Sequence, residues 1–191
     1  MKTALSHSVL PWIVALAPIP MLAFAGDSAP IEVLYEVTLD IDHDGKSDRA
    51  VMVREPNGQA DLYIYLGSGD EKLDLTKEPA FLKKLTAQVV AGLESTGKGS
   101  LVVTYGCGGC SNDWETTLTI VDRGGEFLVA GFTFDWDTRY DMGRCDINFL
   151  TGKGVLSDGV GGSKPIKGKF RPIRLADWSD DKSPDACDVD G

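Results

Sequence analysis

The chain has 191 residues, of which 25% are charged, and its 29 acidic against 19 basic side chains give a formal net charge of −10 at pH 7. This acidity opposes binding to nucleic acid or to an anionic membrane, because such surfaces are bound by neutralising phosphates with Lys and Arg. The same acidity favours solubility and the binding of cations. The length is sufficient for one domain with its own hydrophobic core.

Residues 1–25 have the pattern of a secretory signal peptide. A basic residue precedes a mostly apolar run over 9–24, and residues 23–25 have the small-x-small pattern that precedes cleavage. The run is interrupted by prolines and is shorter than the roughly 20 apolar residues of a spanning helix. We therefore expect a single β-rich domain over 26–176, an acidic C-terminal tail over 177–191, no membrane span, and a periplasmic or secreted location.

The chain holds two histidines, and only His43 lies outside the expected signal peptide. A site built from two or three imidazoles is thereby excluded from the mature chain, which removes the usual zinc hydrolase sets. A Ser-His-Asp triad would also have to use His43. His43 lies inside an acidic loop, whose pattern is not that of a catalytic triad.

Residues 40–48, with the sequence DIDHDGKSD, have the spacing of a calcium-binding loop. Carboxylates stand at loop positions one, three, five and nine, and Gly45 stands at position six, where a sharp turn favours a residue without a Cβ. A hard cation such as Ca²⁺ takes about six to eight oxygen ligands, and alternate residues of a tight loop can direct theirs inward. Without a cation, four like charges in this loop would repel one another.

The flanks of this loop differ from those of an EF-hand. Position twelve is Val51 and not the bidentate Glu, and residues 31–39 and 49–54 have the alternation and β-branched content of strands. The stretch 33–66 resembles the D-x-D-x-D-G-x-x-D loop of FG-GAP and VCBS-type repeats of extracellular proteins, in which one strand enters the calcium loop and another leaves it. That resemblance implies Ca²⁺ as the cofactor and no particular activity. The ligands it implies are the carboxylates of Asp40, Asp42, Asp44 and Asp48 and the carbonyl of Lys46.

Short strands joined by turns are expected along the rest of the chain. The predicted strands are 61–66, 86–94, 100–105, 114–121, 126–136, 145–150 and 169–175. A helical turn is expected at 78–85, with Pro79 near its start, and a helix over 83–93 is the alternative to the strand at 86–94. Residues 152–164 are expected to form a glycine-rich loop.

This pattern predicts a mainly β fold with antiparallel sheets and at most one short helix, arranged as a sandwich or a partial propeller. A complete propeller is not expected, because that fold repeats its blade about four or more times. The acidic loop pattern occurs once in this chain.

Four cysteines in an oxidising compartment indicate two structural disulfides. Three pairings are possible, and we favour Cys107 with Cys110 and Cys145 with Cys187, because the second bond would hold the C-terminal tail. The spacing of Cys107 and Cys110 also matches a thiol-disulfide redox motif. Such motifs depend on a helix N-terminus to lower the thiolate pKa, whereas a strand is predicted to follow here.

Three further patterns have both a chemical and a structural interpretation. Asp135 and Asp137 share a strand face, but a glycosidase pair normally comes from different elements across the substrate. Basic side chains between Lys164 and Arg174 would contact an anionic glycan or the acidic tail, or form a solvated strand face. The tryptophans would either form a sugar-stacking surface or pack in the core; they are Trp114, Trp136 and Trp178.

From these features we expect a secreted or periplasmic, calcium-stabilised β domain that acts as a non-catalytic binding or envelope-associated module. Its partner would be an unknown protein or a glycan. The alternatives are a periplasmic thiol-disulfide protein using Cys107 and Cys110, and a glycan-binding or glycan-cleaving protein.

Overall fold

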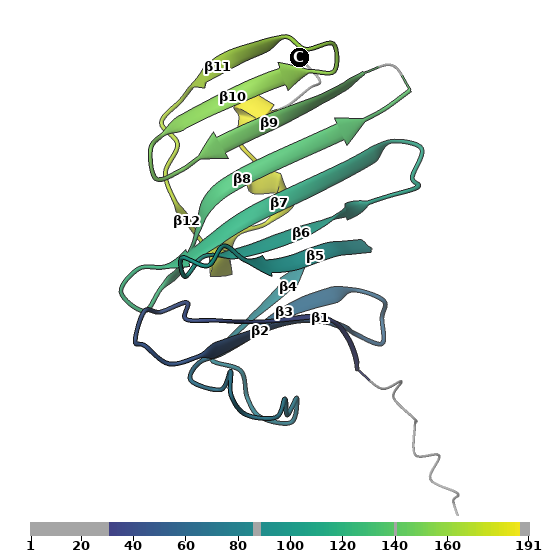
Figure 1. Ribbon diagram of the computed structural model, residues 1–191. Helices are drawn as coiled ribbons and strands as arrows, with labels where there is room; N and C mark the ends of the chain where they lie inside the picture. Colours follow the sequence, from purple (N-terminus) through teal and green to yellow (C-terminus); the bar gives the residue numbers. More distant parts are fainter. Residues whose placement is uncertain (1–30, 86–88, 140, 188–191) are drawn as a thin grey trace, which may run out of the picture.

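The computed structural model describes residues 31–85, 89–139 and 141–187. The expected signal peptide and the last four residues of the expected tail, 188–191, lie outside this described part. Within it the chain is mainly β, with antiparallel strands in two sheets (Figure 1). The predicted fold class is therefore confirmed. No helix among the described residues is long and apolar enough to cross a membrane.

The smaller sheet has four strands in the order β1-β2-β3-β4. Its strands are β1 (Glu32–Leu39), β2 (Asp48–Arg54), β3 (Ala60–Tyr65) and β4 (Phe81–Leu85). Strand β2 is buried on both faces: Met52 joins the main core, while Val51 and Val53 pack with Tyr65 in a second cluster beneath the segment after β3. This double burial explains its continuous apolar run.

Strand β4 occupies the place of the expected helical turn at 78–85, and that prediction was wrong. Burial alternates along β4, so that Phe81 and Leu85 face the core, and the Phe81 ring contacts Phe127 with centroids 5.3 Å apart. Alternate burial is a strand pattern, and pairing with β3 satisfies the backbone. The alternative helix over 83–93 is also wrong, because described residues there belong to β4 and β5.

The larger sheet has eight strands, seven of which follow one another as a meander. They are β5 (Val89–Ser95), β6 (Leu101–Cys107), β7 (Asp113–Asp122), β8 (Phe127–Asp137), β9 (Met142–Asn148), β10 (Lys153–Asp158) and β11 (Ser163–Lys167). Where the pairing of β8 with β9 ends, the short β12 (Ile173–Arg174) pairs with β8 instead. The strand predicted at 169–175 is thus reduced to these two residues.

The expected glycine-rich loop at 152–164 was wrong, since β10 and β11 form a hairpin there. A Cβ added to Gly154 would lie 3.0 Å from both the Asp146 carbonyl oxygen and the Ile147 side chain. Glycine at this position permits close packing inside a strand and does not mark a turn.

One hydrophobic core joins both sheets and the C-terminal segment. Its members include Leu39, Met52 and Ile64 from the smaller sheet, Val103, Leu118 and Phe132 from the larger sheet, and Leu175, Trp178 and Cys187 from the C-terminal segment. The two sheets therefore share a single core, and the C-terminal segment completes it.

The C-terminal segment folds over one face of the larger sheet in three single-turn 3₁₀ helices, η1 (Leu175–Asp177), η2 (Asp180–Lys182) and η3 (Asp185–Cys187) (Figure 1). Trp178 is only 2% exposed, and its indole Nε1 donates to the Tyr105 hydroxyl at 3.1 Å. That hydroxyl donates to Asp180 at 2.7 Å, and burial raises the pKa of Tyr105. The described part of the expected tail is thus packed against the sheet.

Both predicted disulfides are present. Cys107, the last residue of β6, is bonded to Cys110 in the turn before β7, and Cys145 of β9 is bonded to Cys187 in η3. The second bond connects the end of the C-terminal segment to the middle of the larger sheet, as its pairing was expected to do.

Candidate metal centre

The acidic loop connects β1 to β2, two neighbouring antiparallel strands of the smaller sheet. The last pair of their ladder joins Leu39 to Asp48, so that the intervening residues form the turn. Two of them have left-handed backbone conformations, His43 with φ of 62° and Gly45 with φ of 84°. Because glycine adopts this conformation at no steric cost, Gly45 serves the turn as its position in the loop predicted.

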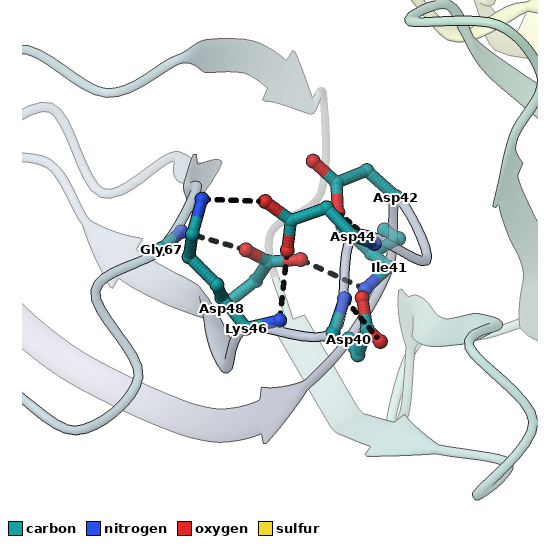
Figure 2. A network of polar contacts seen from close by, with 8 residues as sticks. Asp40, Ile41, Asp42, Asp44, Lys46, Asp48 and Gly67 are labelled. Atoms are coloured by element: carbon teal, nitrogen blue, oxygen red, sulfur yellow. Dashed lines mark hydrogen bonds and ion pairs between the residues drawn. The ribbon is translucent and has the colours of Figure 1, made fainter.

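Asp48 holds this loop closed by its own hydrogen bonds. Its side chain is fully buried, and Oδ2 accepts from the Ile41 backbone N–H at 2.8 Å. Its Oδ1 accepts from the Gly67 backbone N–H at 2.7 Å, so that the loop is joined to the segment following β3 (Figure 2). The carboxylate therefore satisfies two backbone donors on separate segments.

Three of the four predicted carboxylates converge. Ligand oxygens of Asp40, Asp42 and Asp48 all lie within 4.8 Å of one another. Oxygens bound to one Ca²⁺ at about 2.3–2.6 Å are separated by at most roughly 4.6–5.2 Å, so the three are compatible with a common centre. Asp40 Oδ2 accepts from Gly45 N at 3.1 Å, whereas its buried Oδ1 has no hydrogen-bond partner.

A hard divalent cation fits this donor set. A buried carboxylate oxygen without a partner carries a desolvation cost that a bound cation would offset. All three converging groups are carboxylates, which suit Ca²⁺ or Mg²⁺ better than a softer metal. The residues that would hold the ion are Asp40, Asp42 and Asp48.

Asp44 is directed elsewhere. Its Oδ2 accepts from Lys46 Nζ at 2.9 Å and its Oδ1 from Lys46 N at 2.8 Å (Figure 2). These hydrogen bonds lower the pKa of Asp44. Asp44 is not among the residues whose oxygens converge, so the geometry separates it from the other three predicted ligands.

Two glycines outside the loop give it room against both sheets. A Cβ added to Gly69 would lie 2.5 Å from the Ser47 side chain, and one added to Gly99, in the turn between β5 and β6, would lie 2.1 Å from the His43 ring. Loop residues thus contact the segment after β3 and a hairpin of the larger sheet. Sequence reasoning did not connect these glycines to the loop; both stand in turns, which was their only signal.

The candidate redox cysteines, the tryptophans and the basic residues each have a structural explanation. Cys110 is followed by β7, which offers no helix N-terminus to activate a thiolate. Trp136 and Trp178 are buried in the core, and the half-buried Trp114 packs against Tyr105 with centroids 6.4 Å apart. The first of the basic side chains between Lys164 and Arg174 lie on the edge strand β11, where exposed lysines disfavour pairing with another sheet.

Comparisons with protein-family models, with curated proteins and with solved structures found no match to this chain.

Proposed function

We propose that this protein is a secreted or periplasmic β domain, stabilised by calcium and by its two disulfides, that acts as a non-catalytic binding or envelope-associated module. The observation that carries the calcium role is the convergence of Asp40, Asp42 and Asp48 beside a buried Asp40 oxygen without a partner. The two disulfides favour an oxidising compartment.

The role proposed for the ion is structural. Its site lies in the connection between β1 and β2, and loop residues contact the segments at Gly69 and Gly99. An ion bound there would relieve the repulsion among three carboxylates and hold these contacts together. Because only the folded chain brings the carboxylates together, binding would stabilise the folded state by mass action.

Calcium at about 100 times its dissociation constant is expected to add about 2.7 kcal/mol to the free energy of unfolding. For a chain of this size that corresponds to a rise in melting temperature of roughly 5–10 °C over a chelated sample. The substitution Asp42→Asn is expected to abolish this rise, because it removes one of the three converging charges. Differential scanning calorimetry with calcium and with EDTA measures the effect.

The matched control is Asp70→Asn, which removes one exposed carboxylate outside the loop and should keep the full response to calcium. An identical melting curve for the wild-type protein in calcium and in EDTA would contradict the proposal. So would an Asp42→Asn variant that responds as the wild-type protein does.

A second substitution separates the converging carboxylates from the fourth. Asp44→Asn is expected to weaken the calcium response less than Asp42→Asn does, because Asp44 is paired with Lys46 and lies outside the converging group. Calcium titrations of the two variants, followed by intrinsic tryptophan fluorescence, give the comparison. Equal losses of affinity would mean that Asp44 leaves Lys46 to bind the ion.

A further inference from the structure

A groove lies across one end of the larger sheet, far along the chain from the acidic loop. Its volume is about 530 Å³, within the range of roughly 300–1,000 Å³ that small-molecule sites occupy. Five neighbouring strands or strand ends contribute consecutive triplets to its lining, 106–108, 113–115, 135–137, 142–144 and 157–159.

The groove lies on the face of the sheet opposite the core. The central residues of two triplets, Cys107 and Trp136, are buried, with 9% and 7% of their surface exposed. Side chains alternate between the faces of a strand, so the first and last residue of each of these triplets face the other side. A Cβ added to Gly108 would meet no atom within 4 Å, so that end of the groove is open.

Two rungs of like charge cross this face between β7 and β8. Asp113 is paired in register with Asp137, and Glu115 is paired with Asp135. Side chains of directly paired residues are about 4.5–5.5 Å apart at Cβ, and like charges in such pairs are destabilising. The two rungs are two residues apart along each strand, or about 6.8 Å.

Little in the protein offsets these charges. Arg144 is the single cation of the groove lining, and it lies 3.5 Å from Asp135. Because Asp158 also lines the groove, one guanidinium stands against five carboxylates, which leaves a formal charge of −4. Asp113 accepts a hydrogen bond from Gly109 N at 2.9 Å. Partial burial raises the pKa of Asp135, although Arg144 opposes this.

The carboxylates of Glu115 and Asp137 have no hydrogen-bond or ion-pair partner among the described residues. These two side chains occupy diagonal corners of the two rungs. Asp135, which is ion-paired, stands at the corner adjacent to both of them. Two unpaired carboxylates at diagonal corners are complementary to a ligand with more than one positive charge.

The charge distribution of the groove suits an extended ligand better than a compact ion. Within the described part of the chain, the only group of three or more carboxylates that converges on one point is Asp40, Asp42 and Asp48 of the acidic loop. Four of the five groove carboxylates are instead spread over the two rungs. Their complement is an extended cation whose charges are separated by apolar spacers, and the wall of the groove is mainly apolar.

We propose that this groove binds a linear polyamine, with its ammonium groups paired to the carboxylates of Glu115, Asp135 and Asp137 and its methylene spacers against the glycine-lined wall. This inference names a ligand class for the binding role proposed above and rests on that role. It does not depend on the calcium loop, which lies on the connection between two other strands.

The test is isothermal titration calorimetry of spermidine into the disulfide-bonded protein in calcium at low ionic strength. We expect saturable binding of one molecule per chain, and a dissociation constant roughly tenfold higher in the double variant Glu115→Gln, Asp137→Asn. The control Glu94→Gln, Asp70→Asn removes the same charge from exposed positions outside the groove and should keep the wild-type affinity. Equal weakening by both double variants would show diffuse attraction to an acidic protein and overturn the proposal.

A second pair of variants tests the shape of the groove. A Cβ at Gly108 meets no atom within 4 Å, and the same holds at Gly92 of β5, which does not line the groove. Gly108→Phe is therefore expected to fold and to abolish binding by occupying the groove, whereas Gly92→Phe should bind as the wild-type protein does. Undiminished binding by Gly108→Phe, or complete competition by Mg²⁺ at matched ionic strength, would overturn the proposal.

The melting temperature of the same variants is also measured in calcium and in EDTA. A protein that binds spermidine without responding to calcium would refute the structural role of calcium and leave the groove proposal standing. A protein that responds to calcium without binding spermidine would refute the groove proposal alone.

Discussion

Removing the Cys145–Cys187 disulfide with the double substitution Cys145→Ala, Cys187→Ala is expected to lower the free energy of unfolding by about 4 kcal/mol. The bond closes a loop of 42 residues in sequence, and the loss of loop-closure entropy in the unfolded chain grows with the length of the closed loop. Both cysteines are also buried in the core, so that the C-terminal segment loses its attachment to β9. Urea denaturation of the oxidised protein measures the change.

The internal comparison is Cys107→Ala, Cys110→Ala. That bond joins residues only three apart, so the same model predicts a loss of about 2 kcal/mol. Equal losses for the two pairs would contradict the loop-length argument. In the first variant, protease cleavage should increase first near Trp178, because the segment there is held by the bond and by contacts with Tyr105.

Replacing Asp48 is expected to destabilise the protein even in the absence of calcium. In EDTA, Asp48→Ala should lower the free energy of unfolding by about 3 kcal/mol, because the backbone N–H groups of Ile41 and Gly67 lose a charged and fully buried acceptor. The effect is therefore separate from any loss of metal binding.

Asp42→Ala is the matched control, since it removes the same charge from the same loop. The Oδ1 of Asp42 accepts one hydrogen bond, from Asp44 N at 3.1 Å in an exposed turn. In EDTA, Asp42→Ala should therefore lower the free energy of unfolding by about 1 kcal/mol or less. Denaturation of both variants in EDTA and in calcium distinguishes the two contributions. If both variants lost the same stability in EDTA, Asp48 would have no structural role beyond its charge.

Features encoded by neighbouring residues were the ones that sequence reasoning predicted well. The spacing of aspartates around Gly45 predicted a tight turn between two strands, and the left-handed conformation of Gly45 agrees. The strands predicted at 114–121 and 126–136 are β7 and β8, which pair as an antiparallel hairpin. Both depend on local conformational preferences that act over a few residues.

Two segments were predicted wrongly because local preference was overridden by packing. The segment containing Phe81 lacks a long alternating pattern, and it becomes β4 because β3 offers a strand edge and the core accepts Phe81 and Leu85. The glycine at 154 suggested a loop, but it permits β10 to lie close to β9. The sequence of each segment does not show that β3 or β9 lies beside it.

The sequence by itself therefore determined the class of fold and the position of the acidic loop, and it favoured, among three possible pairings, the cysteine pairing that the structure contains. Only the tertiary structure decided which carboxylates come together. Lys46 draws Asp44 away from the other three, Gly67 joins Asp48 to a distant segment, and the register of β7 with β8 places Asp113 beside Asp137. Such contacts depend on strand register and burial between residues far apart in the chain, and no local pattern encodes them.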